Sequence, residues 1–462
     1  MGDIEMVANP DEPSFGEESK EEANTGWQER PRPWMKGLSR SKLFDLAPVI
    51  LALVVLGLKL MIINTPGPEP SGGKGFVFDE AHYVPAIRQM LNGSAANNEH
   101  PPLSKALMML GVIVFGDNPV GWRISIVICS AVSVALLYYV ILELTKNKLV
   151  AFGASLFFAT DVMSFNIGQI AILDSPAMAF SLVTAFFFLK KRHILGSIFL
   201  GLAFLCKLTS IFIVVGLLAY LFFSKPLRKG ELTKHVADWI EVLEKYFFIG
   251  LIVGMVGLWV YDAYYGAFNT PLEHLDFMLS YHSSLKYQNA SEVVFPLPIP
   301  PGSPTNSWTT YFPPAGYFVT TVTESANGQV VKEYHPIAYY GIYSPIWWTI
   351  WALVPMGLYS LYRYFRSGEV SKVDLFILMW IAATFLPHVA FAYVMQRWVY
   401  TFYFYDTIPA LCIGVSYYLT RPGVPKITII IVTAVQLFWF FNFFPVRSKL
   451  HTDILLSLGL RA

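Results

Sequence analysis

The feature that most constrains this chain is a series of long apolar stretches that recurs along most of its length. A helix that spans a bilayer requires about 20 mostly apolar residues. Only 14% of the residues are charged, whereas soluble domains carry roughly 25%. The sequence therefore predicts an all-α polytopic membrane protein. The eleven candidate spans are 44–63, 119–142, 149–165, 167–189, 193–206, 208–223, 246–265, 344–365, 373–391, 398–420 and 427–444.

The remaining segments divide the chain around this transmembrane domain, which we place at residues 43–445. Residues 1–42 are rich in Glu, Asp, Pro and Ser and poor in large aliphatic side chains, so we expect a disordered cytoplasmic tail. The stretch 102–115 is too short to span, and we expect an amphipathic helix lying in the membrane interface. Residues 446–462 form a short outer segment. The three cysteines lie in apolar stretches and predict neither a disulfide nor a metal site.

The distribution of Lys and Arg predicts the orientation of the spans. Basic residues gather in alternate connections, such as "TKNK", "SKPLRKGELTK" and "RYFRSGEVSK", and such connections face the cytoplasm. This orientation places the N-terminus inside. It places the two long loops, 64–118 and 266–343, outside. The sequons at Asn92 and Asn289 lie in those two loops.

Ionisable residues gather toward the same outer face. Asp79 and Glu80 lie in "FVFDEAHYV", soon after the first span, and the first loop also contains Glu99 and His100. A charge within the hydrocarbon region costs several kcal/mol on most scales, so such residues are usually functional or paired. Charges confined to one face favour chemistry at that surface over transport across the bilayer. The ionisable residues at or near the outer ends of spans are Arg123, Asp174, Lys207, Asp262, His388 and Arg397.

Sugar transfer from a lipid-linked phosphate would use this set of groups. The acceptor hydroxyl loses a proton as it attacks, which requires a carboxylate base, either Asp79 or Glu80. The departing phosphate gains negative charge, which Arg and Lys side chains stabilise. Apolar helices would hold the lipid tail. The candidates for binding the donor phosphate are Arg123, Lys207 and Arg397.

Six short motifs, in order along the chain, resemble those of the protein O-mannosyltransferases: "FDEAHY", "NNEHPPLSK", "GWRISIV", "AILDSP", "AFLCKLTSIF" and "YFYDTIPAL". The resemblance implies a GT-C glycosyltransferase fold. It also implies transfer of mannose, with inversion, from dolichyl phosphate mannose to Ser or Thr of proteins on the outer or lumenal face. By position, Asp79 is the implied base, Glu80 its partner, and Arg123 the essential second-span Arg.

The chain departs from the family pattern at several points. Glu99 stands where the family usually has Asp, Leu208 replaces a Trp, and Asp406 replaces a His. We also expect no counterpart of the lumenal MIR domain of the eukaryotic enzymes. The length of the chain favours a cell-membrane protein of an archaeon or bacterium over one of the endoplasmic reticulum. The substitutions leave open a related GT-C transferase with another lipid-linked sugar, or with a lipid or glycan acceptor.

Several residues have both a functional and a structural interpretation. Glu99, His100 and Asp174 would support the catalytic groups, but Glu99 could equally cap the helix that follows, and Asp174 could simply pair with Lys207 or Arg397. His282 and Trp308, in the second long loop, would line the acceptor path or only pack.

The expected partners follow from the implied reaction. They are a polyprenyl-phosphate sugar, a Ser- or Thr-containing protein acceptor and membrane lipid, with no nucleic acid. No resident cofactor and no metal-ligand set are predicted. Dependence on a divalent metal and dimer formation are left open by the sequence.

Overall fold

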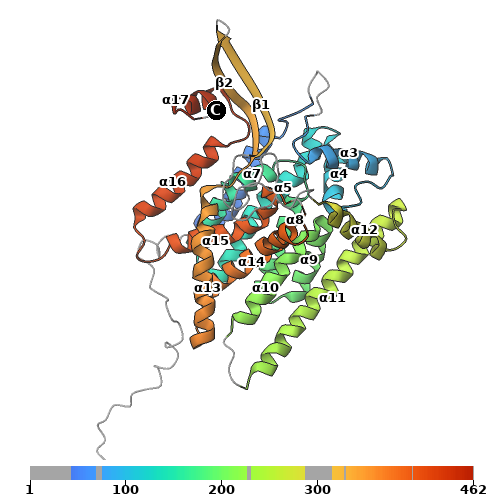
Figure 1. The fold of residues 1–462 in the computed structure, drawn as a ribbon, viewed down its shortest axis with the longest axis vertical. Helices are drawn as coiled ribbons and strands as arrows, with labels where there is room; N and C mark the ends of the chain where they lie inside the picture. Colours follow the sequence, from blue (N-terminus) through green and yellow to red (C-terminus); the bar gives the residue numbers. More distant parts are fainter. Residues whose placement is uncertain are drawn as a thin grey trace, which may run out of the picture.

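The computed structural model describes residues 43–68, 75–225, 230–286, 315–326, 329–397 and 399–460. The predicted tail at 1–42, the sequon at Asn289 and Trp308 lie outside these ranges. The described residues are mostly helical, which confirms the predicted class (Figure 1). The helices of the first half are α2 (Leu43–Ile62), α3 (Glu80–Leu91), α4 (Leu103–Phe115), α5 (Pro119–Thr145), α6 (Lys148–Ala159), α7 (Val162–Ile167), α8 (Asp174–Leu189), α9 (His193–Cys206), the 3-10 helix η2 (Leu208–Ile211) and α10 (Phe212–Phe223).

The second half adds further helices and a β-hairpin. Its elements are α11 (Leu232–Tyr265), α12 (Pro271–Ser284), β1 (Ala315–Ala326), β2 (Gln329–Gly341), η4 (Pro345–Thr349), α13 (Ile350–Ser367), α14 (Lys372–Tyr393), η5 (Thr401–Thr407), α15 (Ile408–Leu419), α16 (Lys426–Asn442) and α17 (Lys449–Ser457). Helix α5 packs against α2, α4, α6 and α8, while α9 packs against both α8 and α11. Helix α14 packs against α10, α13 and α15. The buried core lies between these helices.

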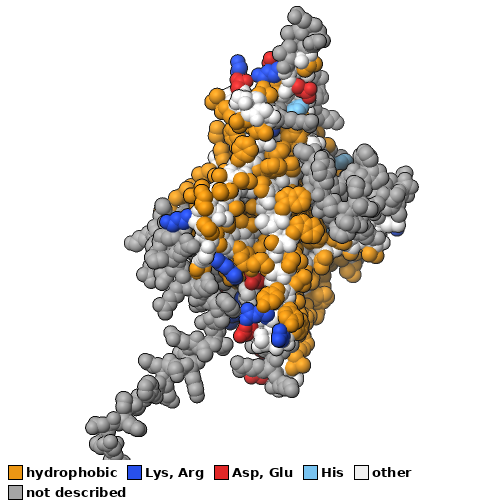
Figure 2. Space-filling view, turned by 60° about the vertical axis from the view of Figure 1, so that its left-hand side comes forward, with side chains coloured by type: hydrophobic (Ala, Val, Ile, Leu, Met, Phe, Trp, Pro, Cys, Tyr) orange, Lys and Arg blue, Asp and Glu red, His pale blue; other side chains and the backbone are white. Residues whose placement is uncertain are grey.

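The predicted spans agree with helices in position but not always in continuity. Four helices, α2, α5, α11 and α14, are long and apolar enough to cross a bilayer by length and composition. Six shorter apolar helices accompany them, so helix length alone does not establish eleven crossings. On the face shown in Figure 2, hydrophobic side chains cover much of the flank. Such an exterior suits a hydrocarbon environment.

In the predicted span 167–189, Ile167 ends α7 and the helix resumes only at Asp174. Residues 168–173 form a buried turn between α7 and α8. Backbone N–H groups outside a helix need other acceptors when they are buried. In this turn the Ala171 N–H donates to the Glu80 carboxylate at 2.7 Å. The interruption therefore connects the bundle to the first long loop.

Parts of the two long loops lie together at one end of the bundle. The His274 ring of α12 hydrogen-bonds the Asn98 carbonyl at 2.9 Å, and the Tyr261 hydroxyl donates to the Asn98 side chain at 2.7 Å. Helix α4 forms as predicted and leaves Ile113 and Val114 exposed. That apolar face suits the membrane interface, although its depth there stays a prediction.

The β-hairpin was not predicted. Strands β1 and β2 pair antiparallel, from Ala315↔Gly341 to Ala326↔Gln329, and project from the same end as α3 (Figure 1). The β-branched and aromatic residues of "YFVTTVTES" favour a strand. However, this segment lies within the long loop 266–343, for which the sequence analysis predicted no regular element. The C-terminal segment packs beside the hairpin: the Ala338 N–H donates to the Pro445 carbonyl at 2.8 Å, and Lys332 pairs with Asp453 of α17 at 3.1 Å.

Candidate active site

Two adjacent carboxylates begin helix α3 and lie in different environments. Asp79 is the N-cap residue and is partly exposed, whereas Glu80 is the first residue of the helix and is fully buried. An acid at the start of a helix is favoured by the helix dipole. The helix start therefore fixes both side chains, and their surroundings distinguish their roles.

Glu80 forms a two-pronged ion pair with Arg123 of α5. Arg123 Nε lies 2.7 Å from Glu80 Oε1, and Arg123 Nη2 lies 2.7 Å from Oε2. The N–H groups of Val77 and Ala171 also donate to Glu80, at 2.9 and 2.7 Å. This carboxylate is therefore saturated with donors and is poorly placed to accept a proton from a substrate.

Arg123 is equally committed to the protein. Its Nη1 donates to the carbonyls of Ile63 and Pro66, at 2.9 and 3.0 Å, and its Nη2 also donates to the Gly75 carbonyl at 3.3 Å. A guanidinium has five N–H donors, and these contacts together with Glu80 use all five. The geometry thus disagrees with the predicted contact between Arg123 and a donor phosphate. Arg123 instead holds the first loop against α5.

Asp79 has the opposite character. Its side chain makes no capping hydrogen bond, and no Lys or Arg of the described residues forms an ion pair with it. Burial and the nearby Asp174 carboxylate raise the pKa of Asp79 from 3.8 to about 6, while His82 and Lys207 act in the opposite direction. A carboxylate with a raised pKa and free oxygens is suited to act as a general base.

Lys207 and Asp174 form a second ion pair close to Asp79. Lys207 follows α9 and Asp174 begins α8, and the Nζ–Oδ1 distance is 2.5 Å. The side chains are 15% and 5% exposed, respectively. The pairing predicted as the structural alternative for Asp174 is therefore present. The Lys207 ammonium also lies over the rings of Phe402 and Tyr403, at 5.6 and 5.3 Å from their centroids.

Arg397 is a cation of this region that forms no ion pair with a carboxylate among the described residues. It lies between α14 and η5, and its Nη2 is 3.1 Å from Nδ1 of His282 in α12. Since Arg can only donate, His282 accepts through Nδ1 and is neutral. Burial and Arg397 lower the pKa of His282 to about 4, which maintains this arrangement at neutral pH.

The motif "NNEHPPLSK" forms a compact loop beside these groups. The His100 ring lies 5.1 Å from His282 and 5.6 Å from Tyr83, and burial lowers the pKa of His100. Lys105 donates to the carbonyls of Asn97 and His100, the latter at 3.0 Å, and these hydrogen bonds stabilise the conformation of the loop. The capping alternative for the preceding Glu99 is not present, because Pro102 is the N-cap of α4 and no side chain caps it.

Two tyrosines near Asp79 were not identified from the sequence. Tyr317 of β1 stacks on Phe78, with 4.4 Å between the ring centroids. Burial is the main cause that raises the pKa of Tyr317, and the charges of Asp174 and Asp79 raise it further. Tyr403 of η5 faces Lys207 and Arg397. Tyr403 lies within "YFYDTIPAL" and could have been found there, whereas no motif surrounds Tyr317. Within the described residues, no cluster of three or more His, Cys, Asp or Glu is arranged to hold a metal.

The architecture is that of the GT-C glycosyltransferases. The chain is similar to a subunit of the Saccharomyces cerevisiae protein O-mannosyltransferase Pmt1-Pmt2 complex bound to the sugar donor, with a TM-score of 0.59, 14% identity, and 90% of this chain and 92% of that chain covered. It also resembles the archaeal oligosaccharyltransferase AglB from Archaeoglobus fulgidus, in complex with an inhibitory peptide and a dolichol-phosphate, with a TM-score of 0.52, 12% identity, and 90% and 57% covered.

The sequence comparisons match part of the chain to one family. Residues 99–257 match the family model described as dolichyl-phosphate-mannose-protein mannosyltransferase. The polyprenol-phosphate-mannose–protein mannosyltransferase of Mycolicibacterium smegmatis is 29% identical over 163 residues, which cover 34% of this chain and 30% of that protein. Its Mycobacterium tuberculosis counterpart is 32% identical over 117 residues, covering 24% and 22%. The matched segment thus spans less than a third of either relative. The resemblance to the protein O-mannosyltransferases is confirmed.

Proposed function

We propose that this chain is an inverting glycosyltransferase that moves mannose from a polyprenyl phosphate, such as dolichyl phosphate, to Ser or Thr hydroxyls of proteins at the outer or lumenal membrane face. One observation carries the proposal. Asp79, unlike its saturated neighbour Glu80, presents a carboxylate without an ion-pair partner among the described residues, near Lys207. The family match and the names of the relatives support mannose as the sugar and protein as the acceptor.

Asp79 is the proposed base. As the acceptor oxygen attacks the anomeric carbon, its proton passes to the Asp79 carboxylate, and the bond from that carbon to the phosphate oxygen breaks. The pKa of about 6 keeps Asp79 ionised at neutral pH while bringing its basicity closer to the operating range. Glu80 and Arg123 act as positioning residues, because their ion pair fixes the start of α3, which carries Asp79.

Arg397 and Lys207 are the proposed phosphate ligands. The Arg397 Nη2 group contacts neutral His282, which orients the guanidinium without neutralising it. Lys207 has three N–H donors and uses one on Asp174, so two remain for phosphate oxygens. The charge that builds on the leaving phosphate is stabilised by such fixed cations. The lipid tail would follow the apolar helix surfaces.

Transfer by the purified chain tests this function. The full chain, reconstituted in vesicles, is given synthetic polyprenyl phosphate mannose and a peptide with one Thr. We expect a peptide mass increase of one hexose, and an anomeric configuration at the product opposite to that of the donor. Donor consumption without peptide modification would point to a lipid or glycan acceptor instead. Consumption of another lipid-linked sugar in place of mannose would correct the donor.

A further inference from the structure

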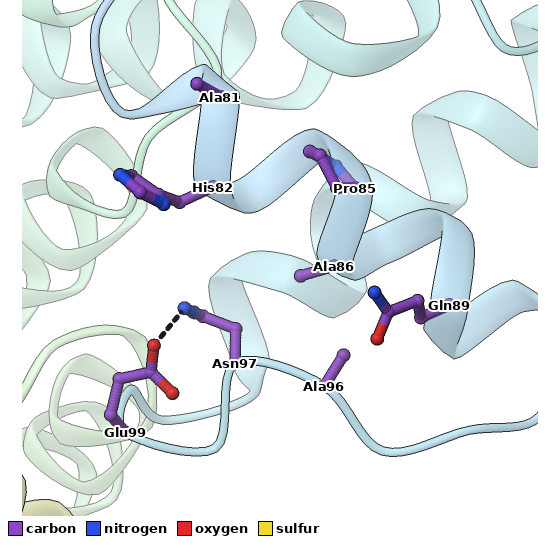
Figure 3. A pocket seen from close by; sticks show the side chains of 8 residues that line it. All are labelled: Ala81, His82, Pro85, Ala86, Gln89, Ala96, Asn97 and Glu99. Carbon is purple, nitrogen blue, oxygen red and sulfur yellow. Dashed lines mark hydrogen bonds between the residues drawn. The ribbon is translucent and has the colours of Figure 1, made fainter.

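A polar recess opens beside Asp79 and is not used by the proposed chemistry. It has a volume of about 280 Å³ and lies between α3 and the segment 96–99 (Figure 3). Its α3 wall includes His82, Pro85, Ala86 and Gln89, which share one helix face because side chains three and four positions apart are neighbours. The wall therefore begins within one turn of the base.

The recess is separate from the groups assigned to the donor. Lys207 and Arg397 are not among its lining residues, and neither is any other Lys or Arg of the described chain. His82, which lines the recess, lies close enough to Asp79 for its charge to affect the pKa of that carboxyl group. A chain whose hydroxyl reaches Asp79 can therefore extend its neighbouring residues into this space.

The lining offers contacts that suit a polypeptide. Ala86 and Ala96 are small and Pro85 is compact, which lets a backbone approach closely. The side chain of Asn97 also lines the recess, and its buried Oδ1 has no hydrogen-bond partner among the described residues. Gln89 adds an exposed amide with both donors and an acceptor.

Glu99 gives the recess its charge. One carboxylate oxygen accepts from Asn97 Nδ2 at 2.7 Å, as drawn in Figure 3. Lys105 lies nearby, but its ammonium is occupied by the carbonyls of Ala96, Asn97 and His100, and no ion pair joins it to Glu99 among the described contacts. The second oxygen is thus available to a cation that enters the recess.

We propose that this recess binds the residues flanking the acceptor Ser or Thr, and that Glu99 makes it prefer a Lys or Arg within a few positions of the hydroxyl. The inference rests on the proposed function and adds to it the charge of the acceptor sequence. A partly exposed ion pair contributes modestly, so the preference is about two- to fivefold in kcat/KM.

Matched peptides test the preference. Each contains one Thr and differs in one flanking position, which is Lys, Gln or Glu. For the wild-type chain we expect kcat/KM to fall in the order Lys, Gln, Glu, and the Lys-to-Glu ratio to shrink as salt is raised, because salt screens exposed charges. Equal values for the three peptides at low salt would overturn the inference, while transfer to none of them would count against the proposed function itself.

Variants of Glu99 locate the effect. Glu99→Gln keeps an acceptor for Asn97 but removes the charge, so the Lys-to-Glu ratio should fall to about one, and Glu99→Lys should invert it. The matched control is Glu333→Gln, which removes an exposed acid of the hairpin and should leave the ratio unchanged. Because each readout is a ratio within one variant, a general loss of activity does not imitate it. An unchanged ratio in Glu99→Gln would remove Glu99 from acceptor recognition.

Discussion

Asp79 and Glu80 are consecutive carboxylates in one turn of α3, yet they belong to different parts of the molecule. Glu80 is buried with Arg123, and the two groups use their bonding capacity on each other and on nearby backbone groups. Asp79 is partly exposed, has a raised pKa, and lies near the Lys207–Asp174 pair without forming part of it. The comparison leads us to assign a structural role to the saturated pair and to propose reactivity for the neighbouring carboxylate that was left unsatisfied.

Removing the base should have the largest effect. We expect Asp79→Asn to lower turnover by about 10²–10⁴-fold, because the amide cannot accept the hydroxyl proton. Donor binding should survive, since Arg397 and Lys207 are untouched. Single-turnover transfer and binding of labelled donor would measure the two effects separately. Near-normal transfer by this variant would exclude Asp79 as the base.

Breaking the saturated centre should act on stability. Arg123→Ala leaves Glu80 buried without its partner, and loss of one member of a buried ion pair typically costs about 3–5 kcal/mol. Thermal unfolding of the detergent-solubilised protein should show a clearly lowered midpoint. A variant with wild-type unfolding but impaired donor binding would instead restore Arg123 to the phosphate site.

Neutralising Arg397 should weaken donor use without comparable destabilisation. Hydrogen bonds to charged groups contribute about 1.5–3 kcal/mol, so Arg397→Ala should raise the donor KM by roughly 10- to 100-fold. Arg397→Lys should recover this only in part, because an ammonium lacks the planar fork of a guanidinium. His282→Phe serves as a milder comparison. An unchanged donor KM in Arg397→Ala would assign the phosphate elsewhere.

The smallest effect concerns pH. A base with a pKa of about 6 is active when deprotonated, so kcat/KM should be level above that pH and fall about tenfold per unit below it. For a carboxyl group with an ordinary pKa of about 4, the fall in kcat/KM would begin near that pH instead. A fall that begins only there would mean that the pKa of Asp79 is not raised in the working enzyme. A fall retained by Asp79→Asn would belong to another group.

Much of this molecule could be predicted because hydrophobicity and short motifs are local properties. The apolar stretches located the helices, and "FDEAHY", "AILDSP" and "AFLCKLTSIF" supplied Asp79, Asp174 and Lys207. The hairpin escaped prediction because its strands pair with each other and with the C-terminal segment, and pairing is not visible in a single stretch. Tyr317 was missed with it.

By itself, the sequence determined that the chain is a helical membrane protein with its acids and cations near the ends of spans. It also determined which residues carry the family's motifs. Only the tertiary structure decided their roles. The carbonyls of Ile63, Pro66 and Gly75 converge on Arg123 from one loop, and for this reason we propose a structural role for a residue that the sequence predicted as a phosphate ligand. Burial and bond saturation depend on what surrounds a side chain, and those surroundings come from segments distant in sequence.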